Sequence, residues 1–294
     1  KAQTLYYVAQ LKKVVNTEGS TDEEVEKAKD ALCNAAVQLG YKQYYYYAFE
    51  LTQNYYYNHE EYIKALEMLM AMQEKAQSEN DDYGVWTGNR YIGALYQQAM
   101  NDYVSAKRYI RLSIEAYQNS SDPTLKRQTI ARQYCDLSEC YPPGSDSMRI
   151  NLLKAVEESK VHLDTLRCEY NLAKLSAMQH DYTQFRAHRD YCLGDANFPG
   201  TLFPRGTYFL EAMESIMAGN PDKHLHAFDT LTQYVHKKFL AELAEEYGFH
   251  DISVHMHNQM TTLLEDAIAS NNGARINELD ARFGNIALSA DLAR

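Results

Sequence analysis

The histidines near residue 250 are the first candidates for chemistry, because imidazole serves both as a metal ligand and as a general base. His250, Asp251, His255 and His257 stand close together in the sequence. On one helix, His250 and His257 would lie about 10 Å apart along the axis, too far to share an ion. Asp251 and His255 could pair electrostatically, or coordinate an ion with ligands from elsewhere in the chain. We therefore expect no metal site built from this segment alone.

Motifs for the common catalytic sites are missing from the sequence. It contains no G-x-x-x-x-G-K-[ST], G-x-G-x-x-G, H-E-x-x-H or G-x-S-x-G. His224 and His226 would diverge on a helix, so they form no pair either. An enzyme assembled from scattered residues is the remaining catalytic alternative. We expect a protein that is not an enzyme and that needs no cofactor.

The composition limits the classes of partner. Lys plus Arg number 29 and Asp plus Glu number 40, so the formal charge of −11 repels phosphate backbones and anionic lipid. Nucleic acid is therefore not an expected partner. No run of about 18 apolar residues occurs, so we expect no membrane insertion by this segment. No C-x-x-C pair occurs among the cysteines, which we expect in helix interfaces rather than in disulfides or a zinc ribbon: Cys33, Cys135, Cys140, Cys168 and Cys192.

Paired helices must position whatever binding residues the chain has. The sequence Ile92-Gly93-Ala94-Leu95-Tyr96 precedes Asn101-Asp102-Tyr103-Val104-Ser105-Ala106. This spacing predicts one helix, a tight turn and a second helix, in which Ala106 lets the two backbones approach closely. The first half recurs at Leu51-Thr52-x-x-Tyr55, Leu137-Ser138-x-x-Tyr141 and Leu172-Ala173-x-x-Ser176, and the second half at Glu61-Tyr62-x-x-Ala65 and Asp181-Tyr182-x-x-Phe185.

These segments resemble the tetratricopeptide repeat (TPR), a helix-turn-helix unit with an aliphatic-Gly-x-x-Tyr first helix and an Ala-rich second helix. The resemblance is most specific at residues 86–117. It implies an all-α protein, a right-handed α-α superhelix of about 12–14 antiparallel helices whose concave face holds peptides or proteins. The small residue recurs at positions 52, 93, 138 and 173, at spacings of 41, 45 and 35 residues. The repeat period of the family is about 34, so we expect an irregular superhelix with longer helices or loops.

Helix-breaking Pro and Gly residues predict the domain boundaries. We expect helical repeats over 1–196, a Pro/Gly joint at 197–206, further helical repeats over 207–270 and a C-terminal helix over 271–294. The joint could equally be a long loop between repeats. The last helix could cap the array or connect it to another domain. Asp122-Pro123 predicts a helix start, and Pro142-Pro143-Gly144 predicts the end of that helix.

The resemblance also implies which side chains line the concave face, because the family draws that face from fixed places on each first helix. Aligning Thr52, Gly93, Ser138 and Ala173 on the family's small residue projects several cations onto this face and a single acid, Glu139. Eight tyrosines lie within residues 41–57, more than the core positions of the family require. The predicted groove residues are Tyr46, Phe49, Gln53, Tyr56, Arg90, Gln97, Arg132, Arg167, Tyr170 and Lys174.

The excess of cations predicts a ligand with carboxylates. Arg binds carboxylates in two-point fashion, so we expect an acidic or C-terminal-carboxylate peptide with aromatic or apolar neighbours. In the alternative interpretation, the arginines pair with acids of adjacent helices and the tyrosines only fill the core. A second alternative is the sensory domain of a bacterial histidine kinase or transcriptional regulator, because such proteins carry similar repeats before a connector helix. The sequence indicates neither the compartment nor the oligomeric state.

Overall fold

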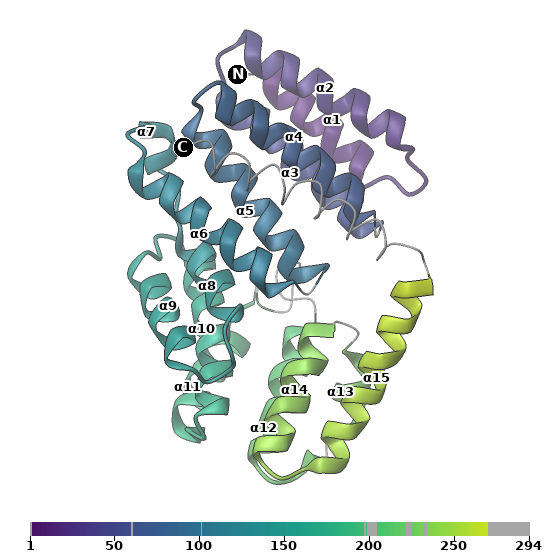
Figure 1. The fold of residues 1–294 in the computed structure, drawn as a ribbon, viewed down its shortest axis with the longest axis vertical. Helices are drawn as coiled ribbons and strands as arrows, with labels where there is room; N and C mark the ends of the chain where they lie inside the picture. The colour runs from purple at the N-terminus through teal and green to yellow at the C-terminus, as the bar shows by residue number, and fades with distance from the viewer. Residues whose placement is uncertain are drawn as a thin grey trace, which may run out of the picture. The chain divides into compact units, whose positions relative to one another are not determined.

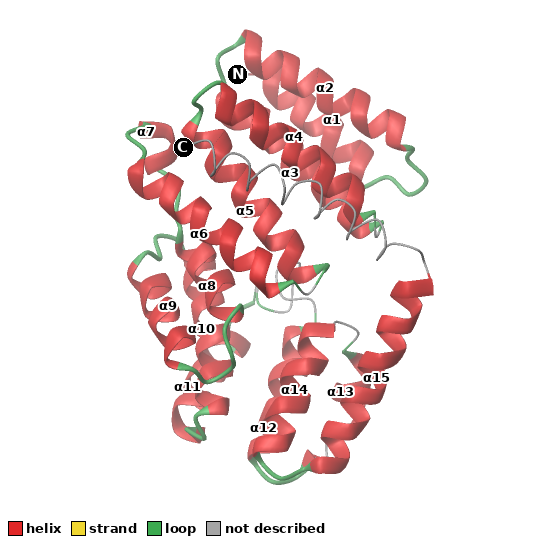
Figure 2. Ribbon diagram, viewed as in Figure 1, coloured by secondary structure: helices red, strands yellow, loops and turns green. Residues whose placement is uncertain are grey.

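The computed structural model describes residues 2–59, 61–100, 102–196, 198, 205–221, 225–231 and 234–269. Throughout these residues the protein is all-α and contains no strand (Figure 2). The chain divides into two compact units between Gln128 and Thr129. Each unit is a series of helices that pack against their neighbours in sequence, the arrangement of an α-solenoid.

The first unit contains seven described helices (Figure 1). They are α1 (Ala2–Val15), α2 (Asp22–Gln38), α3 (Lys42–Asn58), α4 (Tyr62–Ser78), α5 (Asp82–Gln98), α6 (Tyr103–Asn119) and α7 (Pro123–Lys126). Helices α1 and α2, α3 and α4, and α5 and α6 form hairpins. Helix α3 also contacts both α1 and α5, so the first helices of successive hairpins lie side by side.

The second unit contains eight described helices. They are α8 (Ala131–Glu139), α9 (Asp146–Glu157), α10 (His162–Met178), α11 (Tyr182–Leu193), α12 (Gly206–Met217), α13 (Leu225–Thr230), α14 (Tyr234–Glu246) and α15 (His250–Ala269). Helix α10 contacts α8, α12 and α14 as well as its sequence neighbours α9 and α11. Residues from α10 to α15 share one apolar core, which includes Leu166, Phe209 and Leu240.

The same turn joins helices in both units. The second residue after the helix takes a left-handed conformation, and the next amide bonds back to the carbonyl five residues earlier, which satisfies the carbonyls at the helix end. The left-handed residues are Gly40, Asn80, His180, Gly219 and Gly248. The amides that follow them are those of Tyr41, Asp81, Asp181, Asn220 and Phe249. This recurrence is structural evidence of a repeat.

The repeat is close to 40 residues long in the first two thirds of the chain. Helices α3, α5, α7 and α10 begin at Lys42, Asp82, Pro123 and His162, which are 40, 41 and 39 residues apart. The predicted lengthening lies in the helices, because α2 to α6 each contain 17 residues. The intervening turns stay short.

The helix predicted from Asp122-Pro123 begins as expected but is interrupted. Asp122 Oδ1 accepts the amide of Thr124 at 2.7 Å and Pro123 occupies the first turn, yet α7 ends at Lys126. The hydroxyl of Thr129 then accepts the amide of Ala131 at 3.2 Å and starts α8. A threonine that bonds nearby backbone in this way competes with helix continuation. This break and the short α13 raise the number of described helices to fifteen, above the expected 12–14.

The close approach of two helices predicted at Ala106 is present. A Cβ built on Gly93 would lie 2.7 Å from Ile110 Cγ1 and 3.1 Å from the Ile110 amide nitrogen, so only glycine fits between α5 and α6. Ala106 is fully buried on the facing helix. The sequence pattern therefore predicted the close packing of α5 against α6.

The C-terminal half fits the predicted boundaries only in part. Within the predicted helical repeats over 207–270, the described residues form α12, α13, α14 and α15. The predicted joint at 197–206 lies largely outside the described residues, and the helices before and after it belong to the same unit. The predicted segment 271–294 lies outside the described residues altogether.

Candidate functional site

The predicted groove residues fall in both units. Tyr46, Phe49, Gln53 and Tyr56 lie on α3 and Arg90 and Gln97 on α5, all in the first unit. Arg132 lies on α8, and Arg167, Tyr170 and Lys174 lie on α10, in the second unit. Because helices α3 and α5 pack together, and so do α8 and α10, the structure brings the residues together within each unit. The two groups are therefore described separately.

Most of the predicted groove residues of the first unit are buried. Tyr46 is 4% exposed and donates its hydroxyl to Asp81 Oδ2 at 2.8 Å, while Tyr56 is 5% exposed and donates to Glu26 Oε1 at 2.8 Å. Gln53 and Gln97 are also buried. Burial, and then these carboxylates, raise the pKa of both tyrosines. The two rings therefore hold α3 against its neighbours and offer little surface to a ligand.

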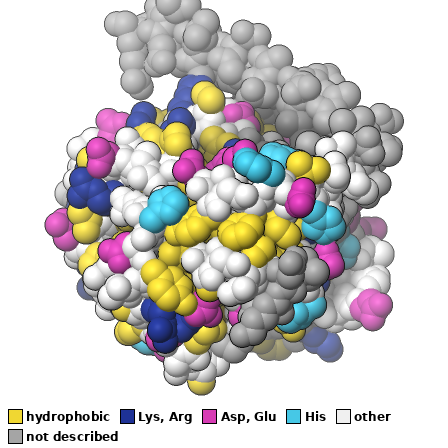
Figure 3. Space-filling model, turned by 90° about the horizontal axis from the view of Figure 1, so that it is seen from below, with side chains coloured by type: hydrophobic (Ala, Val, Ile, Leu, Met, Phe, Trp, Pro, Cys, Tyr) yellow, Lys and Arg dark blue, Asp and Glu magenta, His cyan; other side chains and the backbone are white. Residues whose placement is uncertain are grey.

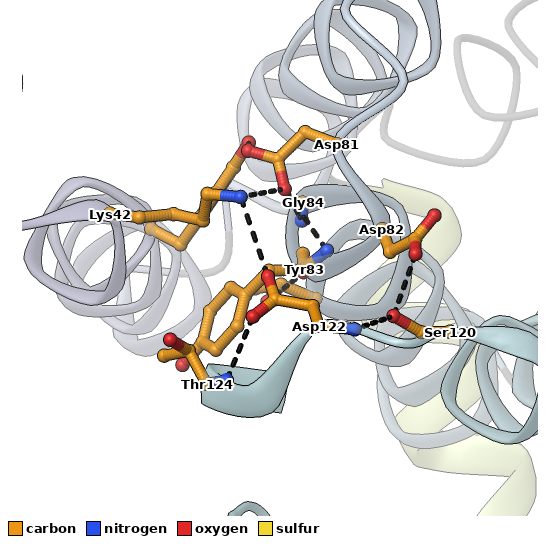
Figure 4. A network of polar contacts seen from close by, with 10 residues as sticks. Lys42, Asp81, Asp82, Tyr83, Gly84, Ser120, Asp122 and Thr124 are labelled. Carbon is orange, nitrogen blue, oxygen red and sulfur yellow. Dashed lines mark hydrogen bonds and ion pairs between the residues drawn. The ribbon is translucent and has the colours of Figure 1, made fainter. Parts of the chain in front are cut away.

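Asp81 is the centre of a polar network that ties three turns of the first unit together (Figure 4). Its Oδ1 accepts the amide of Tyr83 at 3.0 Å and lies 3.0 Å from Lys42 Nζ. Lys42 Nζ also lies 3.4 Å from Asp122 Oδ2. Burial lowers the pKa of Lys42, but the two carboxylates outweigh it and the net pKa is raised. This network is structural, because each group satisfies a helix end or another charge.

Phe49 and Arg90 are the half-buried members of the first group. The ammonium of Lys29 lies 5.4 Å from the centre of the Phe49 ring. The guanidinium of Arg90 lies 4.9 Å from the centre of the Tyr91 ring and 5.6 Å from that of Trp86. Stacking of this kind fixes the guanidinium plane while its edge keeps N–H donors.

The cations of the second unit differ in whether an acid neutralises them. Lys174 Nζ donates to Glu139 Oε1 at 2.7 Å, so this pair joins α10 to α8. Arg132 Nε lies 3.6 Å from Asp136 Oδ2, one turn away on the same helix. Among the residues that the structure describes, no carboxylate lies within ion-pair distance of Arg167, which is half-buried. The alternative in which acids of adjacent helices pair with the cations therefore describes Lys174 and does not describe Arg167.

Tyr170 belongs to an aromatic and histidine cluster that the sequence did not reveal. Its hydroxyl lies 3.3 Å from His236 Nε2 of α14, and the His236 ring stacks on Phe209 at 4.5 Å between centres. Lys174 Nζ lies 5.5 Å from the centre of the Phe239 ring. Burial, and then the charge of Lys174, lower the pKa of His236 to about 3. His236 is therefore neutral at neutral pH, and its uncharged ring has one nitrogen that donates and one that accepts a hydrogen bond.

The histidines near residue 250 pair with acids instead of with each other. His250 Nδ1 lies 3.0 Å from Glu245 Oε1, and His255 Nε2 lies 3.1 Å from Asp229 Oδ1. Within the described ranges, no three His, Cys, Asp or Glu side chains are placed to hold a metal ion. The paired carboxylate raises the pKa of His250, which is exposed.

The described part of the second unit has a hollow between two of its turns. It has a volume of about 510 Å³ and lies between the turn at Gly219–Pro221 and the turn at Gly248–Ile252. Seen from below, the molecule shows a band of apolar side chains with charged and histidine side chains around it (Figure 3). No helix in the described part of the chain is both long enough and apolar enough to span a bilayer.

Comparison of the chain with protein-family models and with curated proteins yields no match. The repeat pattern and the side-chain contacts therefore carry the functional argument.

Proposed function

We propose that this protein is a non-catalytic helical-repeat module of the TPR type that binds acidic peptides on the face of α8 and α10. The observation that carries the proposal is Arg167, a half-buried guanidinium with no carboxylate partner in the described residues. The guanidinium of Arg167 is partly removed from water, and no acid in the described residues compensates its charge. Such a cation is what a surface that receives a carboxylate requires.

Arg132 and Arg167 form the anion-binding pair of this proposal. They occupy equivalent places on neighbouring helices, and both are half-buried. The charge of Arg167 acts on the thiols of both Cys135 and Cys168, so it reaches α8 as well as its own helix. Lys174 is not expected to contribute, because it donates a 2.7 Å hydrogen bond to Glu139, whereas Arg132 Nε lies 3.6 Å from Asp136 Oδ2, beyond hydrogen-bond distance. A planar guanidinium pair favours a carboxylate over a larger or neutral group.

The proposal is tested with a panel of fluorescein-labelled octapeptides measured by fluorescence anisotropy. The panel contains peptides with four Asp or Glu and one Phe or Tyr, and copies in which Asn or Gln replaces the acids. Each is made with a free carboxylate and with an amidated C-terminus. We expect the acidic peptides to bind, and binding to weaken as salt rises, since exposed charges are screened. Equal binding of acidic and neutral copies would refute the proposal.

Substitution of Glu139 sharpens this test within the same face. Glu139→Gln removes the partner of Lys174 and leaves a second available cation on α10. We expect the acidic peptides to bind about threefold to tenfold more tightly, as for one added charge-assisted hydrogen bond in a half-exposed site. Glu157→Gln, which makes the same charge change at an exposed position on α9, is the matched control. A gain shared by both variants would indicate general charge and not the α8–α10 face.

A further inference from the structure

Two cysteines of the second unit face each other across the helices that carry Arg132 and Arg167. The Sγ atoms of Cys135 on α8 and Cys168 on α10 lie 3.7 Å apart. Each residue is 1% exposed. A disulfide bond is about 2.05 Å long, so the two sulfurs need to approach by less than 2 Å. Helices α8 and α10 are already packed neighbours, and the movement needed is small.

The two thiols are not equivalent. The hydrogen bond with Cys135 lowers the pKa of the Cys168 thiol, and the positive charge of Arg167 acts in the same direction. The same hydrogen bond, and then burial, raise the pKa of Cys135 well above its usual range. Burial raises the pKa of Cys33 and Cys192 to about 12. Since the thiolate is the reactive form, Cys168 is favoured for attack over these isolated thiols.

We propose that Cys135 and Cys168 are a peroxide-sensitive thiol pair that closes to a disulfide between α8 and α10. The Cys168 sulfur attacks one oxygen of hydrogen peroxide, whose O–O bond breaks, to give a sulfenic acid and water. The Cys135 sulfur then attacks the Cys168 sulfur, and the hydroxyl leaves as a second water with the Cys135 proton. In total, two thiols are oxidised to one disulfide and one peroxide is reduced to two waters.

The disulfide would act on the proposed binding face. Arg167 directly precedes Cys168, and Arg132 lies one turn before Cys135. Drawing the two sulfurs together therefore changes the separation of the two guanidinium groups. This part of the proposal rests on the proposed function, while the formation of the disulfide does not. We expect oxidised and reduced protein to differ in affinity for an acidic peptide, because bidentate contacts depend on geometry.

The disulfide is tested by peptide mapping of the folded protein. The protein is treated with hydrogen peroxide, its remaining thiols are alkylated after unfolding, and it is digested with trypsin. We expect peptide 133–149 linked to peptide 168–174, with the loss of two hydrogens. Peptide 133–149 also contains Cys140, so the link must persist in Cys140→Ser and vanish in Cys135→Ser. Cys192→Ser, a buried cysteine of the same unit, is the matched control and must keep the link.

The mechanism gives a second readout. In Cys135→Ser the reaction stops at the sulfenic acid of Cys168, which dimedone labels when the protein is then unfolded in its presence, so the wild type must give less adduct than this variant. If folded wild type shows no linked peptide, or if Cys168 becomes a sulfinic acid without linking, the thiol-pair proposal is overturned.

The binding part is measured with the acidic octapeptide of the panel. We expect its Kd to differ about threefold or more between oxidised and reduced wild type, and not to differ for Cys135→Ser. A linked peptide with no binding of the octapeptide to either form would overturn the proposed function and leave the thiol pair standing. Binding of the octapeptide without a linked peptide would overturn the thiol pair and leave the proposed function standing. A link that leaves the Kd unchanged would overturn the regulation alone.

Discussion

The two units differ in the lengths of their helices and in the contacts that hold neighbouring helices together. In the first unit, α2 to α6 all contain 17 residues, and buried tyrosine hydroxyls bonded to carboxylates connect neighbouring helices. In the second unit, helix lengths run from 6 residues in α13 to 20 in α15, and an apolar core joins α10 to α15. In the first unit, hydrogen bonds between buried tyrosines and carboxylates stabilise the packing of neighbouring helices. The irregular unit leaves Arg167 without an acid, which favours it as the binding surface.

The largest expected difference between the units is the cost of removing an equivalent helix cap. Asp81→Ala deletes the cap of α5 and the partner of Lys42, and leaves the buried Tyr46 hydroxyl without its acceptor. We expect a loss of about 3 kcal/mol from the cap and the unsatisfied hydroxyl together. Asp181→Ala deletes only the bond from the Gln184 amide and should cost about 1 kcal/mol. Urea unfolding measures both.

Equal losses for Asp81→Ala and Asp181→Ala would show that the tyrosine–carboxylate network adds nothing to the first unit. Tyr46→Phe separates the two contributions to the Asp81→Ala result. It removes the hydroxyl together with its need for an acceptor, so it should cost less than Asp81→Ala.

Gly93 in α5 and Ser138 in α8 occupy the same small-residue position of the repeat, so replacing each by the other residue type compares helix packing in the two units. Gly93→Ser places a Cβ against Ile110 and should cost about 2 kcal/mol, because overpacking forces the helices apart. Ser138→Gly in α8 makes the reverse change and should cost about 1 kcal/mol, mainly from backbone entropy. Both are measured by urea unfolding, with circular dichroism of the native states as the control for helicity. A Gly93→Ser variant as stable as wild type would contradict the close packing of α5 and α6.

The next smaller expected effect is a loss of stability of the second unit in acid. The pKa of His236 is lowered to about 3, so the unfolded chain takes up this proton first as the pH falls below 6.5. Stability is then complete above pH 6.5 and is lost as the pH falls toward 3. For a half-buried ring we expect a loss in the second unit of at most about 2 kcal/mol between pH 7 and pH 5. His236→Gln should flatten this slope, and His257→Gln, an exposed control, should not.

The first unit should be sensitive to alkali. Burial raises the pKa of Tyr46, Tyr56 and Tyr83, so their unfolded-state forms ionise first as the pH rises above 10. Stability is present below pH 10 and is lost above it. The single tryptophan, Trp86, lies in the first unit and reports its unfolding by fluorescence, whereas circular dichroism reports both units. On heating at pH 5, part of the dichroism change should precede the fluorescence change, and at pH 11 part of the dichroism change should follow it.

The fold was largely predictable because its local signals agree with its packing. The aliphatic-Gly-x-x-Tyr pattern at Gly93 needs close helix approach, and the capping box at Thr21 and Glu24 satisfies two amides of α2. The interruption before α8 was not predictable from periodicity. It depends on the Thr129 hydroxyl, which accepts the amide of Ala131 and donates to the carbonyl of Glu158, and the second of these bonds forms only after folding.

For the candidate site, the sequence predicted which helices carry the residues but not the partners of their side chains. Aligning the small residues placed Arg132 and Arg167 on neighbouring helices, which the structure shows. Charge alone could not reveal that Lys174 pairs with Glu139, or that the Tyr46 hydroxyl is taken by Asp81, since these partners are 35 residues away. His236 was missed because a lone histidine on a helix carries no local signal. The approach of Cys135 and Cys168 likewise depends on helix packing.

The most direct test of the central claim is the Kd of an acidic octapeptide for Arg167→Gln beside Arg186→Gln. Both variants lose one positive charge from the second unit, but Arg186 is exposed on α11. Circular dichroism and thermal melting first establish that both variants are folded. We predict that Arg167→Gln weakens binding by about tenfold or more, as for the loss of a charge-assisted hydrogen bond, and that Arg186→Gln binds like wild type. Equal affinities for the two variants would contradict the assignment of the α8–α10 face.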